Sequence, residues 1–324
     1  MKTKNILQYS AALATGFLLT GHAIAGPIEV LEKNPVAEVE EVDPFAKAIK
    51  PMSNPTLFDL ALPRTTIRPI FMTQSLPSRI NTMVGEVPLG GDMQLYALQL
   101  EYAFNNRLSF VATKDGYIDF NPDSTLSGDN GWANLAAGLK YAVLYNPESQ
   151  HVMSISAIVE VPTGNTGVFQ GTGDGALNLV LSDVKLLGRW QFAGAIGAHI
   201  PFNTGAESTT GFVSGHVSYW LTDWFAPLVE VNWYRVLNEG NGGNRFASQL
   251  GGAVPAVAQF EGGDLINLGA SNAGVNGDIV TAAAGFRIKL TDNVHLGAAY
   301  ELPVTDVQDN LMKNRITVDM TITF

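Results

Sequence analysis

The sequence Arg315-Ile-Thr-Val-Asp-Met-Thr-Ile-Thr-Phe324, at the end of the chain, alternates strictly between polar and apolar side chains. Successive side chains of a β-strand point to opposite faces, so the apolar residues would share one face and the polar residues the other. One face suits lipid and the other suits water. The pattern, which ends on an aromatic residue, predicts the closing strand of an outer-membrane β-barrel, with Phe324 as an assembly signal.

The composition agrees with a barrel. The chain is 46% hydrophobic and 15% charged, yet it has no internal run of about 18 apolar residues that could form a membrane-spanning helix. Any segments that cross the membrane would therefore be β-strands. The 33 glycines and the absence of cysteine suit a β-rich exported protein without disulfides. A net charge of -11 argues against nucleic acid as a partner, because phosphate binding needs clustered Lys and Arg.

Residues 1–25 have the features of a cleaved signal peptide. Lys2 and Lys4 precede a mostly apolar stretch at residues 6–19, and Ala23-Ile24-Ala25 provides small residues at the cleavage site. This segment predicts export, and together with the closing strand it predicts the cell outer membrane as the location.

Residues 26–63 are rich in acidic residues and proline, which disfavours regular strands. We interpret them as a periplasmic N-terminal extension, and two alternatives remain open for it. One is a flexible spacer. The other is a short plug, in which residues 39–49 form a brief helix that enters the barrel from below.

Residues 64–324 consist of alternating segments joined by turns of two lengths. The short turns place Asn or Asp between hydrophobic flanks, as in Asn105-Asn106 and Thr222-Asp223, whereas the long connections are rich in Gly and Asn. This contrast is typical of a bacterial outer-membrane barrel. We predict an all-β, antiparallel transmembrane barrel of twelve strands, with ten or fourteen as alternatives, near residues 65–74, 93–103, 108–116, 132–144, 151–161, 176–186, 190–200, 212–221, 225–235, 279–290, 294–302 and 315–324.

If the apolar parity faces lipid, the polar parity lines the interior. The candidate lumen-lining residues with titratable side chains are Glu101, Lys140, Glu160, His216, Glu230, Arg287, Lys289, Glu301, Arg315 and Asp319. For any one of them, a place in an interior salt-bridge network is a simpler interpretation than a substrate contact.

Several turn and strand-end motifs resemble a known family. They are Val161-Pro-Thr-Gly-Asn-Thr-Gly167, Gly171-Thr-Gly-Asp-Gly175, Leu221-Thr-Asp223 and the ending from Leu290-Thr-Asp-Asn-Val to Glu301-Leu-Pro303. Across residues 90–324 the chain resembles the outer-membrane proteins of the "MetA-pathway of phenol degradation" family. The resemblance implies an outer-membrane channel or transporter for small aromatic or hydrophobic compounds, and it carries over no binding residue.

One segment resembles an enzyme. Gly215-His-Val-Ser218 is similar to the His-x-Ser of outer-membrane phospholipase A, and Glu230 would lie opposite His216 across a hairpin. The sequence departs from that enzyme after Ser218, where Tyr219-Trp220 replaces Asn-Gly, and the predicted phase directs Ser218 into the lumen. We therefore expect no enzymatic activity. The scattered histidines show no metal-ligand spacing, and no cofactor is expected.

The sequence thus favours a channel or transporter over two alternatives, a structural or surface-interaction barrel and, less favoured, a lipid-modifying enzyme. The expected partners are outer-membrane lipid, the outer-membrane assembly machinery and a small-molecule solute. The longest connection, residues 236–278, is predicted to fold into or over the barrel mouth as a constriction, or else to form a surface hairpin.

Overall fold

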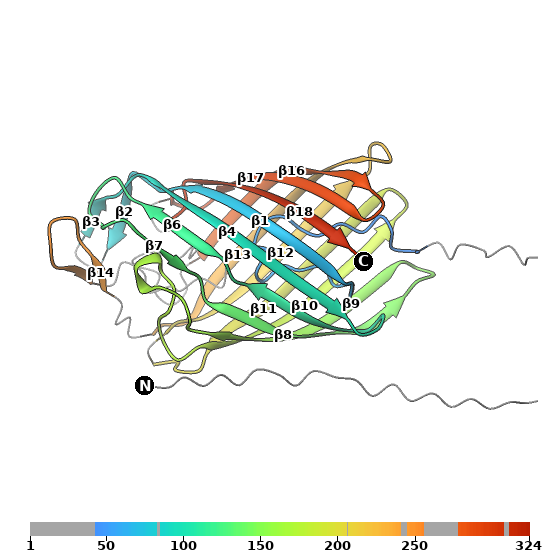
Figure 1. Ribbon diagram of the computed structural model, residues 1–324, viewed down its shortest axis with the longest axis horizontal. Coiled ribbons are helices and arrows are strands. Elements are labelled where there is room, and N and C mark those ends of the chain that lie inside the picture. The colour runs from blue at the N-terminus through green and yellow to red at the C-terminus, as the bar shows by residue number, and fades with distance from the viewer. Residues whose placement is uncertain (1–42, 83–84, 206, 241–244, 256–277, 308–310) are drawn as a thin grey trace, which may run out of the picture. The chain divides into compact units, whose positions relative to one another are not determined.

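The computed structural model describes residues 43–82, 85–205, 207–240, 245–255, 278–307 and 311–324. Its main element is an antiparallel sheet that closes on itself into a barrel (Figure 1). Around the barrel the strands follow the order β1-β18-β17-β16-β13-β12-β11-β10-β9-β8-β5-β4, and β1 also pairs with β4. The predicted closed barrel of twelve antiparallel strands is therefore confirmed.

The strands of the closed sheet and its extensions are β1 (Thr66–Ser75), β4 (Asp92–Ala103), β5 (Leu108–Lys114), β6 (Tyr117–Asn121), β7 (Asp129–Trp132), β8 (Leu135–Asn146), β9 (His151–Val161), β10 (Ala176–Leu187), β11 (Trp190–Pro201), β12 (Thr209–Tyr219), β13 (Phe225–Asn238), β16 (Asp278–Thr291), β17 (Val294–Pro303) and β18 (Asn314–Thr323). Two hairpins lie outside it, β2 (Arg79–Thr82) with β3 (Gly85–Pro88), and β14 (Arg245–Ala247) with β15 (Ala253–Pro255). A 3-10 turn, η1, covers Thr166–Val168. No helix in the described ranges is long and apolar enough to cross a membrane.

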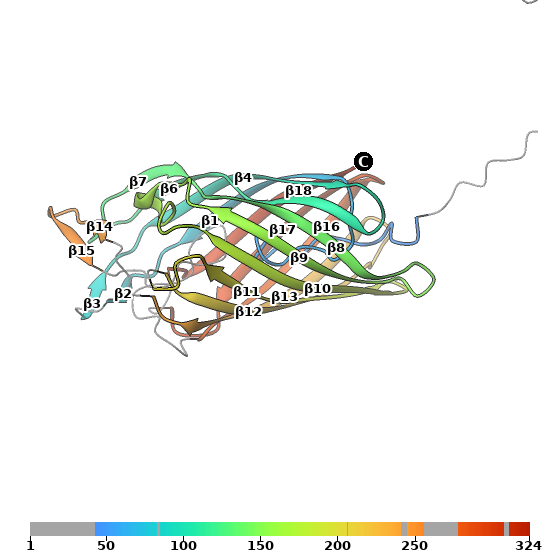
Figure 2. The same ribbon diagram turned by 90° about the horizontal axis from the view of Figure 1, so that it is seen from below.

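The connections differ in length at the two ends of the barrel. One end, here the turn end, holds the reversals at residues 104–107, 147–150, 188–189, 220–224 and 292–293. The other, the loop end, carries the longer connections, and Figure 2 shows the β2–β3 and β14–β15 hairpins projecting there. Two stretches expected to be loops contain strands. β2 and β3 lie between β1 and β4 in the sequence. β6 and β7 prolong the β5–β8 hairpin, and β6 pairs with the first half of β4.

The described part of the longest connection lies against the β6–β7 hairpin. Ser127 N donates to Ala247 O (2.8 Å), and Gln249 N donates to Thr125 O (3.1 Å). The predicted constriction falls mainly on residues 256–277, which are outside the described residues. The alternative is a surface hairpin that extends the two flanking strands; residues 245–255 instead form a separate short hairpin, β14–β15, so this alternative stays a prediction.

Exposure alternates along the strands as the pattern requires. On β4, Tyr96, Leu98, Leu100 and Tyr102 are 44–58% exposed, whereas the residues between them are buried. Large exposed apolar side chains of this kind continue around the wall on the other strands. An outward apolar belt fits lipid as the surrounding medium.

β1 and β18 close the barrel. Thr66 lies opposite both Thr323 of β18 and Glu101 of β4, and Phe324 N donates to Thr65 O (3.0 Å). The ring of Phe324 is 73% exposed, so it packs little against the barrel itself.

We expect deletion of Phe324 to lower sharply the amount of folded barrel in the outer membrane. The deletion removes one hydrogen bond and an exposed ring, so a large effect would come from assembly rather than from stability. Gel mobility of the outer-membrane fraction with and without heating measures the folded amount. The matched control, Phe324→Tyr, keeps an aromatic end and should assemble normally. An unchanged amount of folded protein after the deletion would contradict the assembly role.

Candidate functional site

The described N-terminal residues 43–63, here called the plug segment, lie inside the barrel (Figure 1). Phe45, Ile49, Met52 and Phe58 have no exposed surface, and their neighbours come from strands all around the wall. The segment forms turns and no helix, so the predicted helix is wrong for its described part. Residues 43–63 are largely buried, and residues 26–42 lie outside the described residues, so the choice between a spacer and a plug for residues 26–63 stays a prediction.

Polar side chains of the wall hold the backbone of the plug segment. Glu230 accepts hydrogen bonds from Met52 N (2.9 Å), Ser53 N (2.6 Å) and Ser53 Oγ (2.5 Å). Gln191 accepts from Ile49 N (2.9 Å) and donates to Ile49 O (2.7 Å). A chain without helix or sheet cannot satisfy its own backbone groups, so buried wall residues must do so.

A cluster of two arginines and one carboxylate supports the middle of the plug segment. Arg68 donates to Pro51 O (2.6 Å), and Arg287 donates to Lys50 O (2.8 Å). Both guanidinium groups pair with Asp319, at 2.6 Å from Arg68 Nε and 2.9 Å from Arg287 Nη2. The side chains of all three wall residues are at most 1% exposed. The cluster therefore joins β1, β16 and β18 and presents donors to the plug.

A second cluster joins two charges of the plug segment to two of the wall. Lys50 Nζ lies 2.6 Å from Asp59 and 2.9 Å from Glu101, and Lys140 Nζ lies 2.6 Å from Asp59 and 2.8 Å from Glu101. Each charge has two neighbours of opposite sign. Burial raises the pKa of Asp59, but Lys140 and Lys50 outweigh that effect and hold its pKa well below the ordinary value.

His216 connects Glu230 to Ser218. Its Nδ1 lies 2.7 Å from Glu230 Oε1, and its Nε2 lies 2.9 Å from Ser218 Oγ. Serine, histidine and carboxylate in this order resemble a hydrolase triad. All three are at most 2% exposed, and Glu230 is already bound to Ser53. In this state the trio is part of the network that holds the plug segment.

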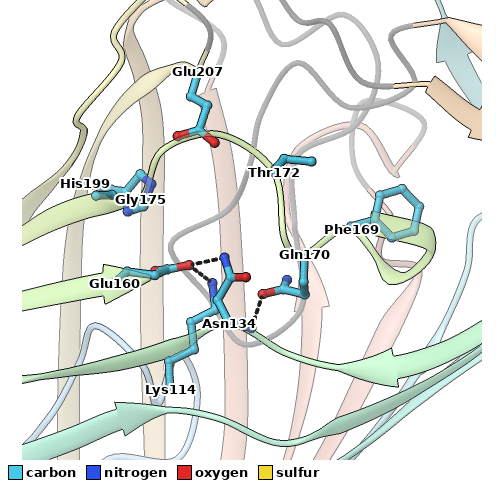
Figure 3. Close-up of a pocket in the computed structure, with 10 residues that line it drawn as sticks. Lys114, Asn134, Glu160, Phe169, Gln170, Thr172, Gly175, His199 and Glu207 are labelled. Carbon is cyan, nitrogen blue, oxygen red and sulfur yellow. Dashed lines mark hydrogen bonds and ion pairs between the residues drawn. The ribbon is translucent and has the colours of Figure 1, made fainter. Parts of the chain in front are cut away.

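A small polar pocket of about 20 Å³ lies at the loop end, between wall residues and the 162–175 connection (Figure 3). Glu160 Oε1 accepts from Lys114 Nζ (2.6 Å) and Asn134 Nδ2 (2.8 Å), and Gln170 Oε1 accepts from Asn134 N (3.2 Å). His199 lies across the pocket, with Nδ1 2.7 Å from Asn178 Oδ1. A space of this size holds about one water molecule, and Gln170, Thr172 and Gly175 of the 162–175 connection form part of its lining.

The ten predicted lumen residues occupy different places. Four of them contact the plug segment, namely Glu101, Lys140, Glu230 and Arg287. His216 bonds to Glu230, and Asp319 bonds to Arg287. Glu160 lies in the loop-end pocket. Arg315 lies 3.6 Å from Glu301, which joins β18 to β17. Lys289 is at the turn end, 29% exposed, and pairs with Asp292 at 2.6 Å.

The sequence interpretation missed Arg68, Lys114 and Gln191. Arg68 and Gln191 share the inward parity of their strands, so parity alone would have found them. Lys114 has the outward parity of β5 but is buried, because an extra residue at the end of β5 shifts the phase. The sequence does contain a sign of this irregularity, because Lys114 comes directly before Asp115-Gly116, a pair typical of turns and bulges. No group of three or more His, Cys, Asp or Glu residues that could hold a metal ion occurs among the described residues.

Comparison with solved structures agrees with this architecture. The COG4313 outer membrane channel from Pseudomonas putida F1 superposes with a TM-score of 0.55 and 14% identity, over 86% of this chain and 100% of that chain. A KdgM porin (TM-score 0.44, 10% identity, 80% and 99% covered) and the β domain of the Bordetella autotransporter Brka (0.43, 11%, 81% and 100%) are more distant. No family model and no curated protein sequence matches the chain. At 14% identity the likeness to the COG4313 channel shows the fold alone.

Proposed function

We propose that the protein is an outer-membrane channel for small molecules whose lumen is closed by its own plug segment. The proposal rests on the observation that residues 43–63 fill the lumen. Side chains can fill a barrel of about eight strands, whereas one of twelve strands is wider. Here a separate stretch of chain, held by hydrogen bonds and ion pairs, occupies the remaining space.

The solute class we propose is small aromatic or hydrophobic compounds with a polar group. The resemblance to the phenol-degradation family first suggested it, and the two sides of the lumen support it. Leu57 and Phe58 of the plug segment pack against Phe212 and Tyr234 on β12 and β13. On β1, β16 and β18 the wall is charged instead. With the plug segment displaced, an apolar ring and a polar substituent would each find a matching surface.

A reversible lock would test the channel. The chain has no cysteine, so Ser53→Cys with Asn232→Cys introduces a unique pair where Ser53 Oγ and Asn232 Nδ2 are 2.9 Å apart. We expect oxidation to abolish channel openings in a planar bilayer and a reducing agent to restore them, because openings require the plug segment to leave the wall. Mass spectrometry verifies the cross-link.

The two single-cysteine variants are the controls and should not respond to oxidant. Openings that persist unchanged in the cross-linked protein would show that ions do not follow the path blocked by the plug segment. A barrel that never conducts, with the lock open or closed, would favour the structural or surface-interaction alternative.

A further inference from the structure

A groove of about 560 Å³ lies on the outer face of the barrel, away from the lumen. It crosses β17, β18, β1 and β4, and it reaches residues 115–116 between β5 and β6 and the end of β7. Its lining is almost entirely apolar. The outward side chains that line it include Phe71, Tyr96, Leu98, Trp132, Val318 and Met320. Within this apolar surface the groove contains one outward carboxylate, that of Asp115.

Within this groove the strand ladder is interrupted twice, once on each side of the paired strands β1 and β4. Between β1 and β18 the pairing stops at Ile67 and resumes at Ile70, because Pro69 has no N–H to donate. Pro69 lies directly opposite Leu98 of β4. On the far side of Leu98 the pairing of β4 with β5 and β6 is also broken, where residues 97–99 face residues 113–116.

Asp115 lies in the second interruption. Its Oδ1 accepts the backbone N–H of Leu98 (2.9 Å), which has lost its ladder partner. Gly116 follows with a φ of +120°, and a Cβ there would come within 2.7 Å of Tyr96 O, so the bulge depends on glycine. An asparagine would accept the same hydrogen bond. The hydrogen bond therefore does not explain the negative charge.

The charge of Asp115 has no cationic partner among the described residues, although the carboxylate is half-buried beside apolar side chains that face lipid. An ionised group at such a place is costly unless it is paired. Tyr96 and Trp132 add two aromatic rings to the same groove, and aromatic faces attract cations. The unpaired carboxylate and the aromatic rings would therefore both favour a cationic ligand.

We propose that this groove is a second site, separate from the lumen, that binds amphiphilic amines. The ligand class is one ammonium group on an alkyl or aryl body. The body lies along the apolar strands, and the ammonium pairs with the free oxygen of Asp115 beside Trp132. The proposal stands whether or not the lumen conducts.

Photolabelling of the full mature chain in lipid nanodiscs tests the site. The probes are a diazirine-bearing dodecylamine and a dodecanoic acid with the same diazirine. The measured quantity is the labelling ratio, which is the amount of label in the groove divided by the amount on the opposite wall, where Phe192 and Val213 are also exposed. We expect the labelling ratio of the amine probe to be at least five times that of the acid probe, a difference that ordinary contact with lipid would not produce. Equal ratios for the two probes would overturn the proposal, and this comparison needs no variant.

A matched pair of variants then tests the charge. Asp115→Asn keeps an acceptor for Leu98 N and should reduce the amine ratio to that of the acid. Asp119→Asn removes a charge four residues further along, in β6, at a position that does not line the groove. This variant should leave the amine ratio unchanged. An amine ratio that survives Asp115→Asn in folded, heat-modifiable protein would also overturn the proposal.

Discussion

Replacement of residues 44–61 by a short Gly/Ser linker should raise the single-channel conductance of the refolded protein at least about threefold. These residues contribute the buried side chains from Phe45 to Ala61 that fill the middle of the lumen. The wall should tolerate their loss. Arg68 and Arg287 keep Asp319 as a partner, Lys140 keeps Glu101, and water can replace the backbone groups of the plug segment.

The current through this variant should be only weakly selective for the sign of the ion. The wall of the described barrel buries five cationic and five anionic side chains, namely Arg68, Lys114, Lys140, Arg287 and Arg315, and Glu101, Glu160, Glu230, Glu301 and Asp319. Conductance steps and reversal potentials in a salt gradient provide the measurements. A linker that replaces residues 247–253 of the β14–β15 hairpin serves as the control, and it should leave the conductance unchanged. If the plug deletion folds but conducts no better than the parent, closure must come from the loop end, around Gln170 and Glu160.

Strand positions could be predicted from the sequence because each strand separates lipid from a polar interior. Because of this requirement, polar and apolar residues alternate along each membrane-crossing strand, as from Arg315 to Phe324. Short polar turns mark one end of each hairpin. Strand ends were less predictable beyond β5, where a register shift after Ala112 interrupts the pattern before β6 and β7.

The contents of the lumen could be predicted only in part. Parity identified Glu101, Glu230 and Asp319 as inward, but it could not show that the first two bind the plug segment. Residues 43–63 carry no period because they form neither helix nor strand, and their wall partners are scattered through the sequence, from 17 positions away between Pro51 and Arg68 to 237 between Lys50 and Arg287. Lys114 illustrates a further limit, since one extra residue in a strand reverses the parity of the residues after it.

Replacement of Asp319 by leucine should destabilise the barrel strongly. Asp319 is the carboxylate between Arg68 and Arg287, and all three side chains are buried. Removal of one partner from a buried ion cluster typically costs about 3–5 kcal/mol, because the remaining charges stay buried without compensation. Here two guanidinium groups would be left, and their hold on Pro51 O and Lys50 O would weaken too. Unfolding by urea in lipid vesicles, followed by tryptophan fluorescence, measures the free-energy change.

A surface pair provides the matched control for Asp319→Leu. Asp292 also has a cationic partner, Lys289 at 2.6 Å, but the side chain of Asp292 is 92% exposed. Water screens that pair, so Asp292→Leu should not change the unfolding midpoint measurably. Combining Asp319→Leu with Arg287→Met should recover part of the lost stability, because one fewer unpaired charge remains in the lumen. Equal unfolding midpoints for Asp319→Leu and Asp292→Leu would mean that water reaches the arginines in the folded barrel, and that the cluster does not hold the plug segment in a dry interior.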